Sequence, residues 1–324
     1  MLVSVLLFAV GLVLLIKGGD WFVDGAVGIA KRFNLPDIVV GATVVSIGTT
    51  LPEVMVSTTG ALAGSGAMAY GNAIGSIICN TALIAAISIT CNPGPVNVKS
   101  MKTPAIFFFC SAALYCLAAY GLGTFPRWMG FVMLAIFVVY MLLTVRNGMK
   151  NPDAAEEEEE EGGKPKKLWQ ELLLLVIGAA VIAVGADLLV DHGQVIAIEL
   201  GVPETVVALL FVALGTSLPE LVTTITSLKK GRASLGVGNV IGANIFNLVL
   251  VSGVAVSLAP FDVPVENTLL NTGLNLSLVF DIPVMLGVMA LMIFPALLGK
   301  KLSRWQGVAL LAIYVGFCVC QFML

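Results

Sequence analysis

Two glutamates, Glu53 and Glu220, lie in long apolar segments and end two nearly identical hexapeptides, GTTLPE and GTSLPE. A charge inside hydrocarbon costs at least ~2.5–3.5 kcal/mol on insertion scales, so the two carboxylates need compensation. Neither segment offers a lysine or arginine at that depth. Two facing carboxylates match the charge of one divalent cation, and hard oxygen ligands suit calcium. The alternative is a pair of protonated, hydrogen-bonded glutamates.

A proline precedes each glutamate and frees backbone oxygens beside the carboxylate. Pro52 and Pro219 lack an amide proton, and each ring clashes with the carbonyl four residues back. Irregular backbone at membrane depth occurs only where it is buried in protein or lines a wet cavity, so the freed carbonyls can become cation ligands. Taken alone, the prolines are more typical of ordinary helix kinks, but a membrane-embedded glutamate beside each one favours the ligand interpretation. Four hydroxyl groups of the same motifs add neutral oxygens suited to sodium: Thr49, Thr50, Thr216 and Ser217.

Amide side chains follow both motifs at helical spacing. Residues four apart share one face of a helix. Two such faces consist of Asn72, Ser76 and Asn80 and of Asn239, Ala243 and Asn247. We expect both faces to look at the glutamates, with the neighbouring glycines serving close helix packing.

The elements that must position these residues are membrane helices. Hydrophobic residues make up 58% of the chain, charged residues make up 11%, and the mean hydropathy is +1.01. Apolar runs of roughly 20 residues, the length that spans hydrocarbon, recur ten times. They cover residues 2–31, 37–63, 69–91, 101–120, 125–146, 168–197, 204–228, 235–259, 274–298 and 303–323. The expected fold class is therefore all-α integral membrane, with ten transmembrane helices.

Basic residues set the expected orientation. Of the 17 lysines and arginines, all but Arg127 and Lys17 fall in loops on one side, which predicts that both termini lie outside. Residues 148–167, with six glutamates from Glu156 to Glu161, read as a cytoplasmic linker, and a weak regulatory cation sensor is the alternative. Asp281 reads as a first-turn charge at a helix N-terminus. Structural roles, namely snorkelling and helix-end contacts, are favoured over a part in ion access for Lys17, Asp20 and Asp24. A net charge of −3 predicts no nucleic-acid partner.

The chain repeats itself. Shifted by 167 residues, positions 18–80 align with 185–247 without a gap and share 23 identities. The halves are residues 1–147, with their motif at 43–80, and residues 168–324, with theirs at 210–247. Each half holds five spans, an odd number, so we expect two inverted five-helix repeats with a site at their midplane interface.

The doubled pattern GTTLPE…GNAIGSIICN and GTSLPE…GNVIGANIFN resembles the two repeats of the cation/calcium antiporter superfamily. The LPE form is similar to the sodium/calcium exchangers, including prokaryotic members, and not to the proton/calcium branch, which usually reads GNxxE. The resemblance implies calcium ligands at Glu53, Glu220 and the backbone oxygens of Thr49 and Thr216. It implies sodium ligands from the glutamates and from Ser46, Thr49, Thr50, Ser76, Ala213, Thr216 and Ser217, with Asn80 and Asn247 beside them. Ala243 and Asn247 depart from the serine and aspartate that many members carry there.

The resemblance implies a multi-pass antiporter of the plasma or inner membrane that exchanges sodium for calcium by alternating access. Its partners would be Ca²⁺, Na⁺ and the lipid bilayer, without a cofactor, and a monomer could act alone. A proton/calcium exchanger is the main alternative, because either glutamate could take a proton. A channel is disfavoured because the chain offers no ring of charges along a pore. An enzyme is disfavoured because the chain carries no H-E-x-x-H motif and no serine with a partner base.

Overall fold

A computed structural model describes residues 2–150, 167–200, 215–264 and 275–323, and they are predominantly helical. The first half contains α1 (Leu2–Arg32), α2 (Asp37–Val40), α3 (Ser46–Leu62), α4 (Gly66–Cys79), α5 (Ala86–Cys91), α6 (Val98–Cys116) and α7 (Arg127–Lys150). The second half contains α8 (Leu168–Glu199), α10 (Leu218–Lys229), α11 (Ala233–Phe246), α12 (Ser252–Leu258), α13 (Ile282–Gly299) and α14 (Arg304–Met323). Short π-helical segments interrupt or extend several spans: η1 (Gly41–Val45), η2 (Asn80–Ala85), η3 (Leu117–Leu122), η5 (Asn247–Val251) and η7 (Ser277–Asp281).

Within the described residues, nine segments are long and apolar enough to cross a membrane. They correspond to nine of the ten spans expected from the sequence, so the chain is a multi-pass membrane protein. The remaining expected span, 204–228, begins in residues 201–214, which lie outside the described part of the chain. Helix α10 covers the end of that span.

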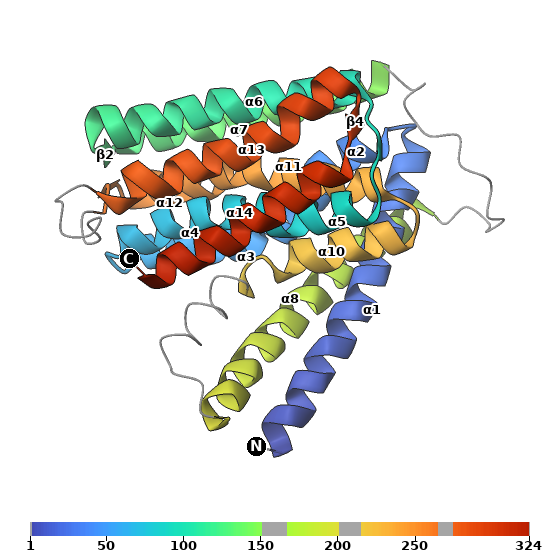
Figure 1. The fold of residues 1–324 in the computed structure, drawn as a ribbon. Coiled ribbons are helices and arrows are strands. Elements are labelled where there is room, and N and C mark those ends of the chain that lie inside the picture. Colours follow the sequence, from blue (N-terminus) through green and yellow to red (C-terminus); the bar gives the residue numbers. More distant parts are fainter. Residues whose placement is uncertain (1, 151–166, 201–214, 265–274, 324) are drawn as a thin grey trace.

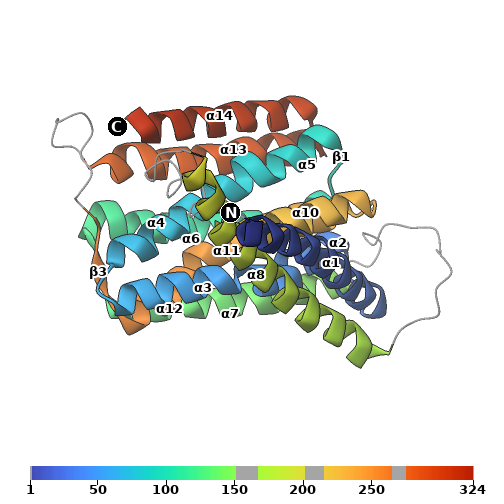
Figure 2. The same cartoon turned by 90° about the horizontal axis from the view of Figure 1, so that it is seen from below.

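Helices α1 and α8 lie side by side and run obliquely away from the other helices (Figure 1). Figure 2, seen from below, shows the same pair crossing in front of the bundle. The pair is antiparallel, because Gly11 of α1 faces Gly185 and Gly25 faces Leu175. A Cβ atom added at Gly11 would lie 2.9 Å from the carbonyl oxygen of Gly185, so glycine is what permits this close backbone approach.

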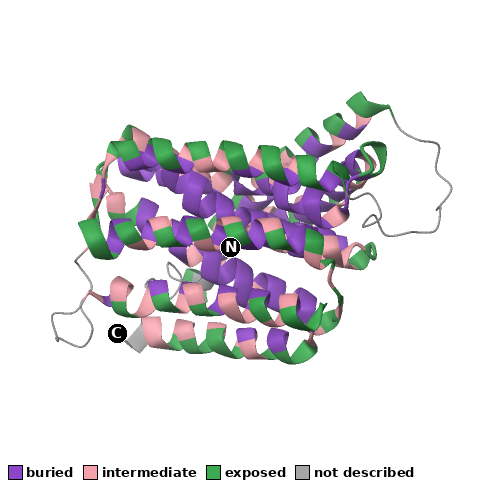
Figure 3. Ribbon diagram, turned by 90° about the horizontal axis from the view of Figure 1, so that it is seen from above, coloured by how far each residue is buried: buried purple, intermediate pink, exposed green. Residues whose placement is uncertain are grey.

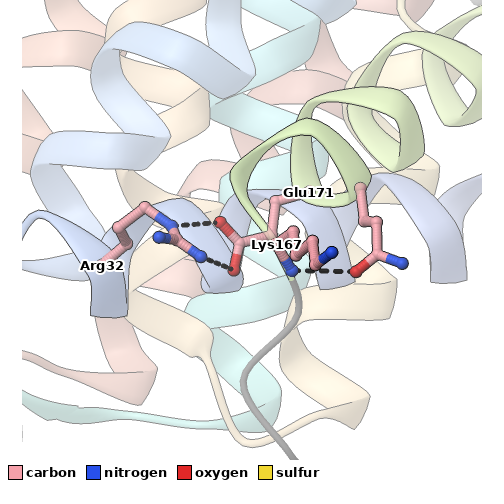
Figure 4. A network of polar contacts seen from close by, with 4 residues as sticks. Arg32, Lys167 and Glu171 are labelled. Carbon is pink, nitrogen blue, oxygen red and sulfur yellow. Dashed lines mark hydrogen bonds and ion pairs between the residues drawn. The ribbon is translucent and has the colours of Figure 1, made fainter.

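An ion pair joins α1 and α8 next to the linker. The Nε of Arg32 donates to Oε2 of Glu171 at 2.9 Å, as Figure 4 shows. The backbone amide of Lys167 donates to Oε1 of Gln170 at 2.8 Å, which satisfies one free donor at the start of α8. Lys230, after α10, donates to Oδ1 of Asp24 on α1 at 2.7 Å. This last bond places Asp24 in a helix-end contact, as the sequence led us to expect.

Helix α11 forms the centre of the bundle. Every residue from Leu235 to Phe246 is buried, and buried segments gather in the interior of the bundle in Figure 3. Gly238 and Gly242 lie against the backbone of the second span, at Ile38 and Ala42. Larger side chains at these glycines would push α11 away from the residues that carry Glu53.

Contacts between the halves come in reciprocal pairs. Arg127 donates to the carbonyl oxygen of Leu258 at 3.1 Å, and Arg304 donates to that of Thr90 at 3.0 Å. The strands behave in the same way: β1 (Gly94–Pro95) pairs with β4 (Lys301–Leu302), and β2 (Thr124–Phe125) pairs with β3 (Phe261–Asp262). These two-residue strands are the one departure of the described residues from an all-helical chain, and they only join loops.

Candidate cation site

Glu53 and Glu220 come from different halves and meet in the interior. Glu53 lies in α3 and Glu220 in the first turn of α10, helices that contact each other, and both side chains are fully buried. No described residue donates a hydrogen bond to any of their four oxygens. The ion pairs found in the described ranges involve other acids.

The two proline motifs have different backbone conformations. Residues 216 and 217 form a turn, α10 begins at Leu218, and Pro219 occupies its first turn, where proline is tolerated. In the first half, α3 continues through Pro52, and the irregular stretch is the π-helical η1 that precedes it. The expected break in the helix therefore lies beside Glu220, whereas the backbone beside Glu53 remains helical.

Two hydrogen bonds cross between the halves next to the glutamates. The hydroxyl of Thr49 donates to Oδ1 of Asn239 at 3.1 Å. The hydroxyl of Thr216 donates to Oδ1 of Asn72 at 3.4 Å. Thr216 and Asn239 each stand 167 positions after their counterparts, so each half donates once and accepts once. Ser46 reinforces the first bond, because its hydroxyl lies 2.9 Å from the carbonyl oxygen of Asn239.

Asn80 and Asn247 open the π-helical segments η2 and η5, at equivalent positions of the two halves. Both side chains are fully buried, and their amide nitrogens and oxygens have no partner among the described residues. The hydroxyls of Thr50 and Ser217 are buried and unpartnered there too. π-Helical turns often occur at functional sites, because the extra residue redirects side chains.

The other site residues expected from the sequence have different outcomes. Ser76 is buried on α4, one turn before Asn80. Ala243 is buried on α11 and offers no side-chain oxygen. Ala213 lies outside the described residues.

Sequence reasoning left Ser57 out of the site. The amide nitrogen of Asn72 donates to the Ser57 hydroxyl at 2.9 Å and lies 3.4 Å from the carbonyl oxygen of Glu53. Thr224, at the equivalent position of α10, is also buried, and its hydroxyl has no partner in the described part of the chain. A hydroxyl four residues after each glutamate was the sequence signal for this second layer.

The arrangement suits a hard cation bound by oxygen atoms. Two carboxylates, two amide oxygens and two hydroxyls are buried without partners among the described residues. Calcium takes six to eight such oxygens in flexible geometry, and neutral oxygens suit sodium. No third acid, histidine or cysteine joins the glutamates in the described ranges, so the charge of the site is set by the two carboxylates alone.

A multi-pass helical protein with unpaired acids buried at its centre belongs to the class of membrane proteins that handle ions. Residues 3–146 and 171–323 match the family model described as sodium/calcium exchanger protein. The chain belongs to this family, which confirms the resemblance to the cation/calcium antiporter superfamily.

Full-length relatives and a solved structure agree with the family match. The chain is 34% identical over 308 residues to a membrane protein of Methanocaldococcus jannaschii, covering 95% of this chain and 94% of that one. It is 30% identical to the sodium/calcium exchanger MaX1 of Methanosarcina acetivorans, covering 99% of each chain. A solved structure of the sodium-calcium exchanger NCX_Mj, soaked without Na⁺ and Ca²⁺, is similar with a TM-score of 0.78 at 31% identity, covering 97% of each chain.

Proposed function

We propose that this protein exchanges sodium for calcium across a cell membrane through a site centred on Glu53 and Glu220. The observation that carries the proposal is the pair of fully buried carboxylates for which the described residues offer neither a hydrogen-bond donor nor a basic partner. Leaving a buried charge unpaired costs several kcal/mol, on the order of 3–5 for a broken pair. One calcium ion, or sodium ions in turn, would neutralise both carboxylates.

The chemistry of the surrounding oxygens favours sodium as the counter-ion. The hydroxyls of Thr50 and Ser217 and the amide oxygens of Asn80 and Asn247 are neutral ligands. They can complete the coordination of a monovalent ion without adding charge. A proton needs one carboxylate and none of these groups, so a proton/calcium exchanger leaves them without a role.

Competition at one site couples the two ions. Two glutamates neutralise two positive charges, so calcium and sodium cannot both be fully compensated there at once. Each occupant therefore favours release of the other, so a single site that opens to one side of the membrane at a time would couple the two ions. Thr49 and Thr216, whose hydroxyls bond across the two halves, would then offer their backbone oxygens to either ion.

Alternating access fits an arrangement of two inverted five-helix repeats, residues 1–147 and 168–324, joined by the linker 148–167. The reciprocal bonds of Thr49 with Asn239 and of Thr216 with Asn72 support this arrangement, because a two-fold relation generates contacts in such pairs. Helices α1 and α8, which lie outside the buried bundle, are the natural moving elements. Both termini would lie outside the cell, as the distribution of the basic residues predicts.

Transport in reconstituted vesicles tests the proposal. Vesicles loaded with sodium are diluted into sodium-free medium containing radioactive calcium, with an ionophore present to collapse any proton gradient. We expect calcium uptake that requires the outward sodium gradient and is absent when sodium is equal on both sides. Uptake that instead follows an imposed proton gradient and ignores sodium would replace the proposal with the proton/calcium alternative.

A further inference from the structure

A cavity lined by both apolar and polar residues lies apart from the glutamates, between α4, the start of the η7–α13 span and the C-terminal part of α14. It measures about 380 Å³. Its polar side chains are those of Tyr70, Asn275, Ser277, Asp281 and Gln321. Asp281 is the one charged residue among the described residues that line it.

The polar groups of this cavity are already organised around the acid. Nε2 of Gln321 donates to Oδ1 of Asp281 at 2.6 Å, which fixes the carboxylate. The hydroxyl of Ser277 donates to the Tyr70 hydroxyl at 3.0 Å, which joins η7 to α4. None of the ion pairs in the described residues includes Asp281. A half-buried carboxylate that has no basic partner among the described residues is available to bind a cation.

A single helix separates the cavity from the central site. Gly71 and Gly75 of α4 line the cavity, while Asn72 on the same helix bonds to Ser57 and to the backbone of Glu53. An α-helix is ~10 Å across with its side chains, so a cation in the cavity would lie about that far from the glutamates. Poorly polarisable surroundings extend the field of a charge over such a distance.

We propose that this cavity is a second cation site, in which Asp281 holds a monovalent cation such as sodium near the outer face of the protein. One carboxylate balances one positive charge, and the oxygens of Tyr70, Ser277 and Gln321 supply neutral ligands of the kind sodium takes. The placement at the outer face rests on the orientation given under the proposed function. The proposal that Asp281 binds a cation does not rest on that orientation, because it is argued from the cavity and the carboxylate alone.

Sodium binding can be measured with the central site disabled. Calorimetry on the purified Glu53→Gln/Glu220→Gln protein, in choline chloride of constant ionic strength, should show residual sodium binding. Adding Asp281→Asn should weaken that binding at least about tenfold, because asparagine can still accept the Gln321 bond but carries no charge. Asp281→Glu should restore it. The matched control is Asp262→Asn, which removes an exposed acid of β3 near the cavity and should change nothing.

Two results would overturn the assignment. One is a double-glutamine protein that binds no sodium, and the other is residual binding that Asp281→Asn leaves intact or that Asp262→Asn weakens equally. Because the central glutamates are absent, neither result depends on whether the protein exchanges sodium for calcium. In oriented membrane vesicles, Asp281→Asn should also raise the half-saturating sodium concentration on the outer side about threefold to tenfold, and leave the inner side unchanged.

Discussion

Replacing Glu53 or Glu220 by glutamine should weaken calcium binding but should stabilise the fold of the cation-free protein. At a calcium–oxygen distance of ~2.5 Å and an effective dielectric constant of ~20, one carboxylate attracts Ca²⁺ by about 13 kcal/mol before desolvation. Removing one member of a buried pair costs a net ~3–5 kcal/mol. Calcium affinity should therefore fall by a factor of roughly 10² to several times 10³. Sodium carries half the charge and should lose less.

The cation-free protein should respond in the other direction. Both carboxylates are buried without partners in the described residues, so each glutamine relieves a charge that destabilises the empty site. We expect the thermal unfolding midpoint in chelator and choline to rise, by an amount equivalent to ~1–4 kcal/mol. Calcium at 100 times the Kd of the wild-type site should stabilise the wild-type protein by about 2.7 kcal/mol. The same calcium concentration should leave the glutamine variants almost unstabilised.

The assay is thermal unfolding of purified protein with and without calcium, followed by vesicle transport of the same samples. Glu171→Gln is the matched control, because it changes another buried glutamate, one that is paired with Arg32. It should lower the unfolding midpoint and keep the calcium-induced shift. Glutamine variants of Glu53 and Glu220 that keep that shift, or that lose stability without calcium, would refute the reasoning.

Three further predictions concern the moving parts, the counter-ion and the packing. A Cβ atom at Gly19 would lie 3.8 Å from the Cβ of Thr226, so the double variant Gly19→Cys/Thr226→Cys should form a disulfide between α1 and α10. This disulfide should stop exchange until it is reduced. Full turnover of the oxidised protein would exclude sliding of α1. Exchange should persist when choline replaces potassium, because Asn247 adds no third charge, and activity that returns only with potassium would contradict this reading. Gly25→Ala places a methyl group 2.7 Å from the carbonyl oxygen of Glu171 and should destabilise the protein by ~1–3 kcal/mol. Gly316→Ala is the control, because its methyl group meets nothing within 4 Å and should leave stability unchanged. Equal unfolding midpoints for the two variants would show that α1 and α8 can separate freely.

The helical spans were predictable because each must satisfy its backbone internally across a fixed hydrocarbon thickness. Apolar length alone therefore gave nine segments that the described residues confirm. The short pairs β1–β4 and β2–β3 were not predictable, since two residues carry no period and their pairing joins loops distant in the sequence. The π-helical segments had no signal either, because an inserted residue in a helix leaves the apolar pattern almost unchanged.

The site residues were predictable by type, whereas their partners were not. Helical spacing placed Asn72 and Asn239 on faces directed at the glutamates, but it could not show that each accepts a bond from a threonine of the opposite half. Such bonds depend on how two helices approach, which is set by glycines such as Gly242 and not by local spacing. Asp281 illustrates the same limit, because a first-turn acid gives no sign of the cavity that Tyr70 and Gln321 complete.

The reciprocal contacts between the halves have a consequence for how such a chain could arise. Arg127 bonds to the end of α12 and Arg304 to the end of α5, which is the pattern of an isologous interface between two identical subunits. If the two halves are inverted five-helix repeats, as proposed above, a single half would carry that interface complete, provided that its copies inserted into the membrane in both directions. Before fusion, one sequence would have to insert into the membrane in two opposite orientations. After fusion, each half can acquire its own lysines and arginines, which fix a single orientation for that half. The linker 148–167 would stand where two ancestral subunits became one chain.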